Sequence, residues 1–155
     1  MLAPTDYGHG IYLIDADYLR PGFAGIYLMV EAGRVAVIET SCNASLPRVL
    51  SFLDDLGIAV GSVDYVIPTH VHLDHAGGAG AMMRAFPNAR LVIHPRGARH
   101  MADPSKLVAG AVAVYGAEQV RALYGEILPI DATRIIEAAD GLTVDLAGRQ
   151  LLCLD

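Results

Sequence analysis

Half of the six histidines of this 155-residue chain lie between His70 and His75, in the segment HVHLDH, which also contains an aspartate. Given the chain's own residue frequencies, a chance match of this pattern is on the order of one in a thousand, so the motif carries a low false-positive risk. The segment follows a run that predicts a strand, Val63 to Ile67, which Pro68 ends because proline lacks the N–H of a central ladder. The fold must therefore place this loop at the end of a strand.

The spacing within the motif suits metal binding. In an extended segment residues i and i+2 point to the same side, so His70 and His72 can converge on one ion about 2.0–2.1 Å from each nitrogen, with Val71 pointing away. Asp74 and His75 come one turn later, where we expect them to bind a second ion. A bound cation favours neutral imidazoles together with an ionised aspartate. The alternatives are a solvated polar loop or core histidines satisfied by hydrogen bonds.

The pattern around the motif predicts a mixed α/β sheet flanked by helices. Short β-rich runs predict strands at 11–14, 26–30 and 35–39, the last two joined as an antiparallel hairpin. Apolar residues at helical spacing predict a helix that starts near Leu46 and ends before Gly57.

After this helix and the 63–67 strand, the segment 69–78 is predicted as a loop, in which Gly77 and Gly78 let the backbone pass close to the site. The later elements are predicted in chain order as a helix at 79–86, a strand at 90–94, a helical region at 96–124 with breaks at Pro104, Gly110 and Gly116, and a closing β meander at 135–137, 142–145 and 151–154.

Composition and charge narrow the class of partner. A 54% hydrophobic content supports one folded domain over residues 1–155. The net charge is −6 and the basic residues are scattered, which favours a small-molecule substrate over nucleic acid. No apolar run approaches the ~20 residues that cross a bilayer, and the N-terminus lacks a secretion-signal pattern, so we expect no membrane partner and a cytoplasmic location.

The two cysteines, Cys42 and Cys153, are expected to be buried free thiols. The oligomeric state is left open.

The stretch THVHLDHAGG resembles the HxHxDH signature of the metallo-β-lactamase superfamily, and the order of elements around it is similar to that family's N-terminal half. The resemblance implies an αββα sandwich of which this chain holds the N-terminal half to two-thirds. It implies two divalent ions, zinc with iron or manganese as alternatives, bound by His70 and His72 and by Asp74 and His75. The implied reaction is hydrolysis of an ester, thioester, lactone or related acyl substrate by a metal-activated hydroxide that Asp74 orients.

Two features depart from the family pattern. Where the family has an aspartate in a DTG turn, this chain has Glu39-Thr40-Ser41. We expect Glu39 to order the motif loop through backbone amides or a ligand histidine, the alternative being a solvated surface glutamate. No histidine follows His100, so the ligands that the family supplies from its second half are missing and the sequence looks truncated at Asp155.

Several other polar residues give weaker signals. His94 could line the mouth of the site, but a hydrogen-bonded histidine at a strand end is the simpler interpretation. Arg96, Lys106, Tyr115 and Tyr124 could shape a substrate pocket, but aromatic residues at helical spacing are more often core, so none is assigned to the site. Two alternative functions stay open, an iron-dependent oxidoreductase of the persulfide dioxygenase kind and a non-catalytic metal-binding fragment.

Overall fold

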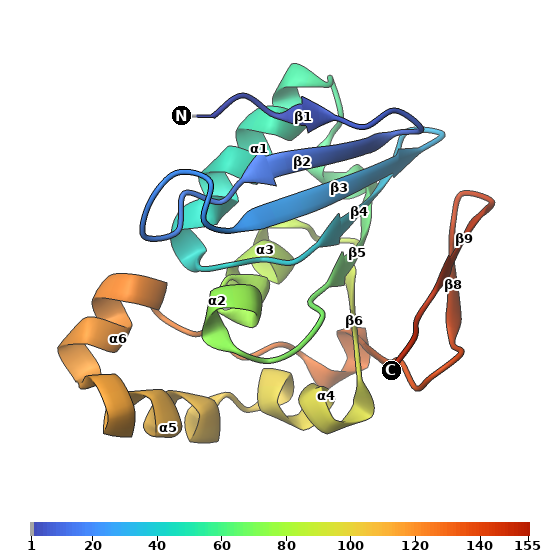
Figure 1. Cartoon of the computed structure of the whole chain (residues 1–155). Helices are drawn as coiled ribbons and strands as arrows, with labels where there is room; N and C mark the ends of the chain where they lie inside the picture. Colours follow the sequence, from blue (N-terminus) through green and yellow to red (C-terminus); the bar gives the residue numbers. More distant parts are fainter. Residues whose placement is uncertain (1) are drawn as a thin grey trace.

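The main sheet of the computed structural model, which describes residues 2–155, contains seven strands in the order of the chain (Figure 1). Strands β1 to β4 pair antiparallel and β4 to β7 pair parallel, so the carboxyl ends of β4, β5 and β6 meet at one edge of the sheet. The strands are β1 Thr5–Asp6, β2 Ile11–Asp15, β3 Gly25–Glu31, β4 Arg34–Ile38, β5 Val63–Ile67, β6 Arg90–Ile93 and β7 Ile135–Glu137. The predicted antiparallel hairpin and the strands around it are confirmed.

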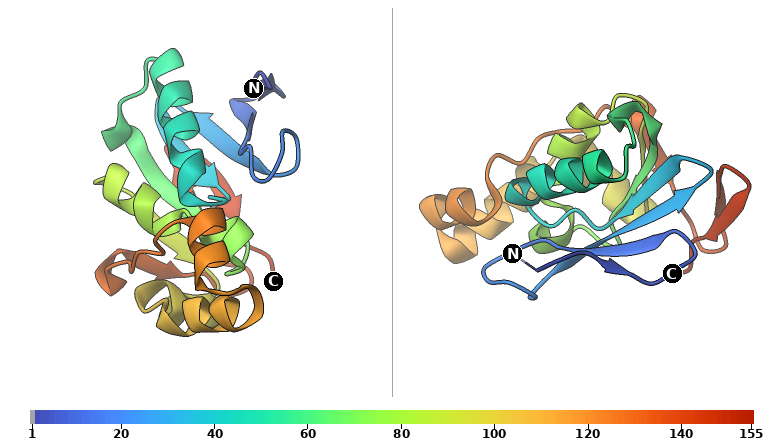
Figure 2. Two further views of the ribbon diagram at one scale, coloured as in Figure 1. Left: turned by 90° about the vertical axis from the view of Figure 1, so that its left-hand side faces the viewer. Right: turned by 90° about the horizontal axis from the view of Figure 1, so that it is seen from above.

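Helices α1 (Leu46–Asp55) and α3 (Ala79–Ala85) lie on one face of this sheet (Figure 2). Their buried side chains form the main core with alternate residues of the strands, among them Leu53 and Met82 from the helices and Leu28 from β3. Short 3-10 helices at Asn43–Ser45, Val60–Ser62 and Ala132–Arg134 connect the larger elements. This core fixes the two loops that leave β4 and β5, which carry the candidate site.

Three helices fill the connection between β6 and β7: α4 (Pro95–Ala102), α5 (Ser105–Tyr115) and α6 (Ala117–Tyr124). The predicted breaks at Pro104 and Gly116 are confirmed, since Pro104 precedes α5 and Gly116 separates α5 from α6 with a φ of +83°. The predicted break at Gly110 is wrong because this glycine lies inside α5, where a helical backbone tolerates it. In Figure 1, α5 and α6 lie near α2 (Leu73–Ala76), the short helix of the motif, and Leu73 of α2 packs with Val120 and Tyr124 of α6.

Two further predictions are corrected. The segment 69–78 is not entirely a loop, because Leu73–Ala76 forms the helix α2, which is too short to show a sequence period. The three closing strands are confirmed, but their predicted arrangement as one meander is wrong. β7 joins the main sheet beside β6, whereas β8 (Thr143–Leu146) and β9 (Arg149–Leu152) form a separate antiparallel pair. Parallel pairing across a long connection leaves no local signal in the sequence.

Cys42 is buried, Cys153 is partly buried, and both are free thiols. None of the helices formed by residues 2–155 has the length and apolar character needed to cross a bilayer.

Candidate metal centre

The site lies where the parallel strands β4 and β5 end. Glu39 follows β4 directly and its backbone N–H donates to the carbonyl of Ile67, the last residue of β5, at 3.1 Å. The chain then passes through Thr69 and His70 into α2, which buries Leu73 and Ala76. Because these two residues face the core, Asp74 and His75 between them lie on the outward side of the helix with side chains 44% and 38% exposed.

The imidazoles of His70 and His72 face one another across the loop. Nε2 of His70 lies 3.2 Å from Nδ1 of His72, and the ring centroids are 4.7 Å apart. Two nitrogen ligands at bonding distance from one tetrahedral zinc ion lie about 3.3 Å apart. The spacing of these two nitrogens therefore suits a shared ion, and Thr69 Oγ1, 2.9 Å from Nδ1 of His70, occupies the other nitrogen of that ring.

Asp74 and His75 form a second facing pair beside the first. Oδ2 of Asp74 lies 3.6 Å from Nε2 of His75, and the His75 ring centroid is 4.1 Å from that of His70. Burial, followed by the neighbouring His75 and His72, lowers the pKa of His70 below its usual value. A lowered pKa keeps this imidazole neutral at neutral pH, which is the form that binds a metal.

The four side chains meet as two pairs rather than as one ligand sphere. Within residues 2–155, no group of three or more His, Cys, Asp or Glu side chains is arranged to hold a single metal ion. The donor set of imidazole nitrogens and one carboxylate nevertheless fits zinc, and also suits iron and manganese. Metal binding by these residues stays a prediction, with two ligands from the described chain for each ion.

Glu39 has the contacts predicted for it. Its Oε1 accepts the backbone N–H of Thr69 at 3.2 Å and its Oε2 lies 3.1 Å from Nδ1 of His75, with the side chain only 13% exposed. The alternative of a solvated surface glutamate is therefore wrong. In the tautomer in which the Nδ1–H of His75 donates a hydrogen bond to this carboxylate, Nε2 carries the free lone pair and faces Asp74.

The turn after β4 is bound tightly to α2. The backbone N–H and the hydroxyl of Thr40 both donate to the carbonyl of His75, at 2.9 and 2.7 Å. The N–H of Gly78 donates to the carbonyl of Ser41 at 2.9 Å. Within this turn Glu39 and Ser41 have left-handed backbones, with φ of 69° and 51°. Strained backbone of this kind is often held at functional sites, and here it aims the Glu39 carboxylate at the motif.

A substitution at Ser41 is expected to stabilise the protein without changing any of the four candidate metal ligands. Its side chain is buried, its Oγ has no hydrogen-bond partner within residues 2–155, and its left-handed backbone favours glycine. We expect Ser41→Gly to stabilise the protein by about 1 kcal/mol, since it removes left-handed strain and an unpaired hydroxyl while adding some unfolded-state entropy. Urea denaturation measures this change.

Ser45→Ala is the matched control for that prediction. Ser45 is equally buried, but its Oγ lies 2.6 and 2.7 Å from the carbonyl oxygens of Thr40 and Cys42, so its one hydroxyl proton has an acceptor. This variant should lose about 1 kcal/mol because the bonded carbonyl is left without its donor. A loss of stability in Ser41→Gly comparable to that in Ser45→Ala would show that the Ser41 backbone is not strained.

The structure distinguishes between the polar residues that gave weaker signals in the sequence. Nδ1 of His94 accepts the backbone N–H of Arg96 at 3.1 Å and caps α4, so the hydrogen-bonded interpretation is confirmed. Lys106, Tyr115 and Tyr124 line a pocket together with His72 and Asp74, whereas Arg96 does not. The sequence did hold a signal for this pocket, an almost uncharged apolar helix that carries the chain's single lysine, but helical spacing alone made a core helix the preferred interpretation.

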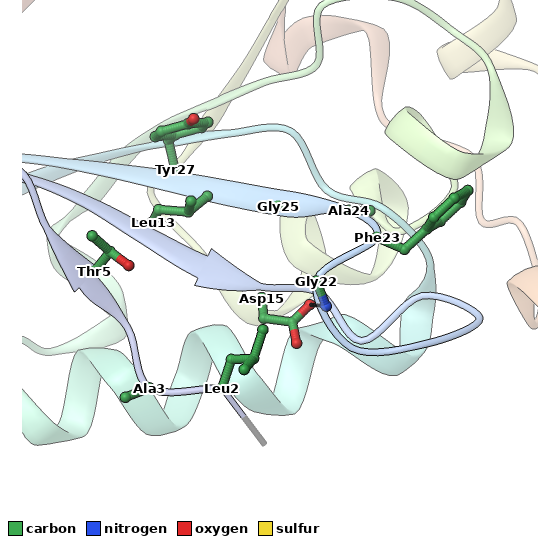
Figure 3. A pocket seen from close by; sticks show the side chains of 10 residues that line it. All are labelled: Leu2, Ala3, Thr5, Leu13, Asp15, Gly22, Phe23, Ala24, Gly25 and Tyr27. Atoms are coloured by element: carbon green, nitrogen blue, oxygen red, sulfur yellow. Dashed lines mark hydrogen bonds between the residues drawn. The ribbon is translucent and has the colours of Figure 1, made fainter.

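A second pocket lies away from the motif, between β1, β2, β3 and the loop that follows β2 (Figure 3). Asp15 is its one carboxylate, and Oδ1 of Asp15 already accepts the backbone N–H groups of Asp17 and Gly22 at 3.0 and 3.1 Å. With no histidine among its lining residues, this pocket does not form a second metal centre.

Comparisons with known proteins agree with the fold. Residues 19–150 match the family model described as the metallo-beta-lactamase superfamily. Curated protein sequences give no match. The structure is similar to the HARLDQ-motif metallo-beta-lactamase of Cronobacter sakazakii (TM-score 0.70, 22% identity), covering 99% of this chain and 54% of that one.

Two other solved structures give the same picture. The Rm3 metallo-beta-lactamase has a TM-score of 0.73 at 20% identity, with 99% of this chain and 51% of that one covered. The native FEZ-1 metallo-beta-lactamase from Legionella gormanii has a TM-score of 0.70 at 17% identity, with coverages of 99% and 52%. This chain therefore spans about half the length of the solved structures that it matches.

Proposed function

The chain belongs to the metallo-beta-lactamase superfamily, and we propose that it acts as a metal-dependent hydrolase that cleaves a small acyl substrate such as an ester, thioester or lactone. The observation that carries this proposal is the facing of His70 Nε2 and His72 Nδ1 at 3.2 Å, beside the pair of Asp74 and His75. Such a spacing is what two ligands of one ion require. The cytoplasmic location expected from the sequence stays a prediction.

We assign His70 and His72 to one divalent ion and Asp74 and His75 to another, with zinc as the preferred metal. A bound divalent ion supplies a water molecule of lowered pKa and a Lewis acid for the substrate carbonyl. The residues of the chain position the ligands and the loop that carries them. Glu39 holds the proton on Nδ1 of His75 and so keeps Nε2 free, and it anchors the loop through the N–H of Thr69.

Asp74 is the proposed base. Its carboxylate lies on the outward side of α2, 44% exposed, where a water molecule can reach it. Its neighbour His75 lies 3.6 Å away and is itself fixed by Glu39, so the carboxylate stands beside a positioned imidazole. A carboxylate in this place can accept a proton from water as that water attacks an acyl carbon, and can return it to the leaving group.

A zinc titration tests the assignment directly. Calorimetry on metal-free protein should give two zinc equivalents, with His72→Ala removing one and His75→Ala removing the other, because each ion loses one of its two chain ligands. His100→Gln is the control, since His100 lies in α4 outside the motif, and it should retain both equivalents. Unchanged zinc binding in both motif variants would contradict the ligand assignment.

The reaction is tested on a panel of esters, thioesters, lactones and β-lactams. Turnover that disappears on chelation and returns with zinc supports the hydrolase. Stoichiometric iron and oxygen consumption on a persulfide, with no acyl turnover, would replace it by the oxidoreductase. Metal binding without either activity would leave the non-catalytic metal-binding interpretation.

A further inference from the structure

A pocket of about 590 Å³ joins the motif to helix α5. His72 and Asp74 line one side of it, and α5 lines the other with Lys106, Gly110 and Val114 among its residues. We call the space between these two motif residues and helix α5 the α5 pocket. Its volume falls within the range of small-molecule sites, about 300–1,000 Å³. A substrate that reacts beside Asp74 therefore has room for a sizeable group against α5.

Helix α5 is unusually apolar for a helix on the surface. None of its 11 residues is buried, and its one charged residue is Lys106. Val114 is 74% exposed and Tyr115 is 57% exposed. Contiguous apolar surface that stays in contact with water is costly and marks a binding surface. Because Val114 and Tyr115 line the same pocket as His72 and Asp74, this apolar surface continues into the candidate metal centre, which favours a small molecule as its occupant.

The rim and floor of the α5 pocket fit this occupant. Lys106 is the only lysine of the chain and forms no ion pair within residues 2–155. Lysine is depleted in the buried centre of protein interfaces, so its place here argues against a protein partner over α5. Tyr124 is held at the floor by a 3.2 Å hydrogen bond from Tyr18, and burial raises the pKa of Tyr18, so this hydroxyl stays neutral.

We propose that the α5 pocket binds the hydrocarbon chain of an acyl substrate whose carbonyl lies beside His72 and Asp74. The preferred substrates are then esters, thioesters or lactones with a long apolar acyl chain rather than a short one. This inference rests on the proposed hydrolase function for the reacting end of the substrate. The binding of the chain to α5 is nevertheless measurable without turnover.

Gly110 offers a sharp test because it faces the open pocket. A Cβ added at Gly110 meets no atom within 4 Å, so a larger side chain there can extend into the pocket without strain. Ala109 is exposed on the same helix and does not line the pocket, so Ala109→Leu adds a leucine outside it. Gly110→Leu and Ala109→Leu thus form a matched pair that differs in where the side chain is placed.

The binding experiment uses metal-free protein and calorimetry with hexanoate, octanoate and decanoate. Each methylene buried in the pocket should raise the affinity by up to about fourfold. Gly110→Leu should weaken decanoate binding at least tenfold, while Ala109→Leu should leave it unchanged. Affinity independent of chain length, or equal losses in the two variants, would overturn the inference.

Turnover of 4-nitrophenyl acetate and decanoate by the zinc-loaded protein separates this inference from the proposed function. Gly110→Leu should lower the ratio of kcat/KM for the decanoate to that for the acetate at least tenfold, whereas Ala109→Leu, which adds its side chain outside the pocket, should leave kcat/KM for both esters within twofold. If neither ester is cleaved but the chain-length and Gly110→Leu effects on binding persist, the hydrolase fails and the pocket stands. If sedimentation shows a dimer that Val114→Asp dissociates and no alkyl carboxylate binds, α5 is a protein interface and the inference is overturned.

Discussion

Replacing Gly78 with alanine is expected to destabilise the protein by about 3 kcal/mol, a large part of the 5–15 kcal/mol that holds a typical domain folded. A Cβ at Gly78 would lie 2.7 Å from the carbonyl oxygen of Thr40 and 2.8 Å from that of Cys42. Both atoms belong to the backbone of the turn after β4, so neither can swing away as a side chain could. The turn would have to separate from the start of α3, and the hydrogen bond from Gly78 to Ser41 would be lost.

The loss should show as a lower urea midpoint with an unchanged denaturant slope. Gly110→Ala is the matched control, because a Cβ there meets nothing within 4 Å and the residue lies inside α5. That variant should gain up to about 1 kcal/mol from better helix propensity. If Gly78→Ala proves as stable as Gly110→Ala, the close approach of the turn to α3 is not required by the fold.

The contacts between this turn and the motif include features that could be predicted from the sequence. The strand before the motif, the direction of the histidines and the role of Glu39 all follow from local chemistry, because a β-strand fixes which residues share a side and a carboxylate near a histidine orients it. The structure places Glu39 against Thr69 and His75 as expected. Its left-handed backbone carries no such signal, since only the surrounding hydrogen bonds hold a glutamate in that conformation.

The features that the sequence did not predict are those that depend on distant segments. β7 pairs with β6 across three helices, and the α5 pocket combines residues of the motif with residues more than thirty positions later. Tyr115 and Lys106 looked like parts of an ordinary helix because periodicity describes a helix without its surroundings. Gly110 was predicted as a break because glycine has a low helix propensity, but α5 continues past it.

The largest catalytic effect is expected at Asp74. In the zinc-loaded protein, Asp74→Ala should lower kcat/KM by about a thousandfold or more, because a metal ligand and the proposed base are lost together. Glu39→Ala should cost about 10–100-fold, since Glu39 contacts His75 and the N–H of Thr69 and acts only through them. The predicted order of the two losses follows from this difference in contact.

Both variants should be compared at saturating zinc, with kcat, KM and bound metal measured on the same samples. Asp74→Ala should lose close to one equivalent of zinc and most of its kcat, whereas Glu39→Ala should keep both ions at high zinc and show a weaker affinity for the ion beside His75. The metal measurement remains informative even where turnover is low. If Asp74→Ala keeps near-wild-type turnover while Glu39→Ala abolishes it, the reactive carboxylate lies in the turn after β4, and the motif supplies only the imidazoles around it.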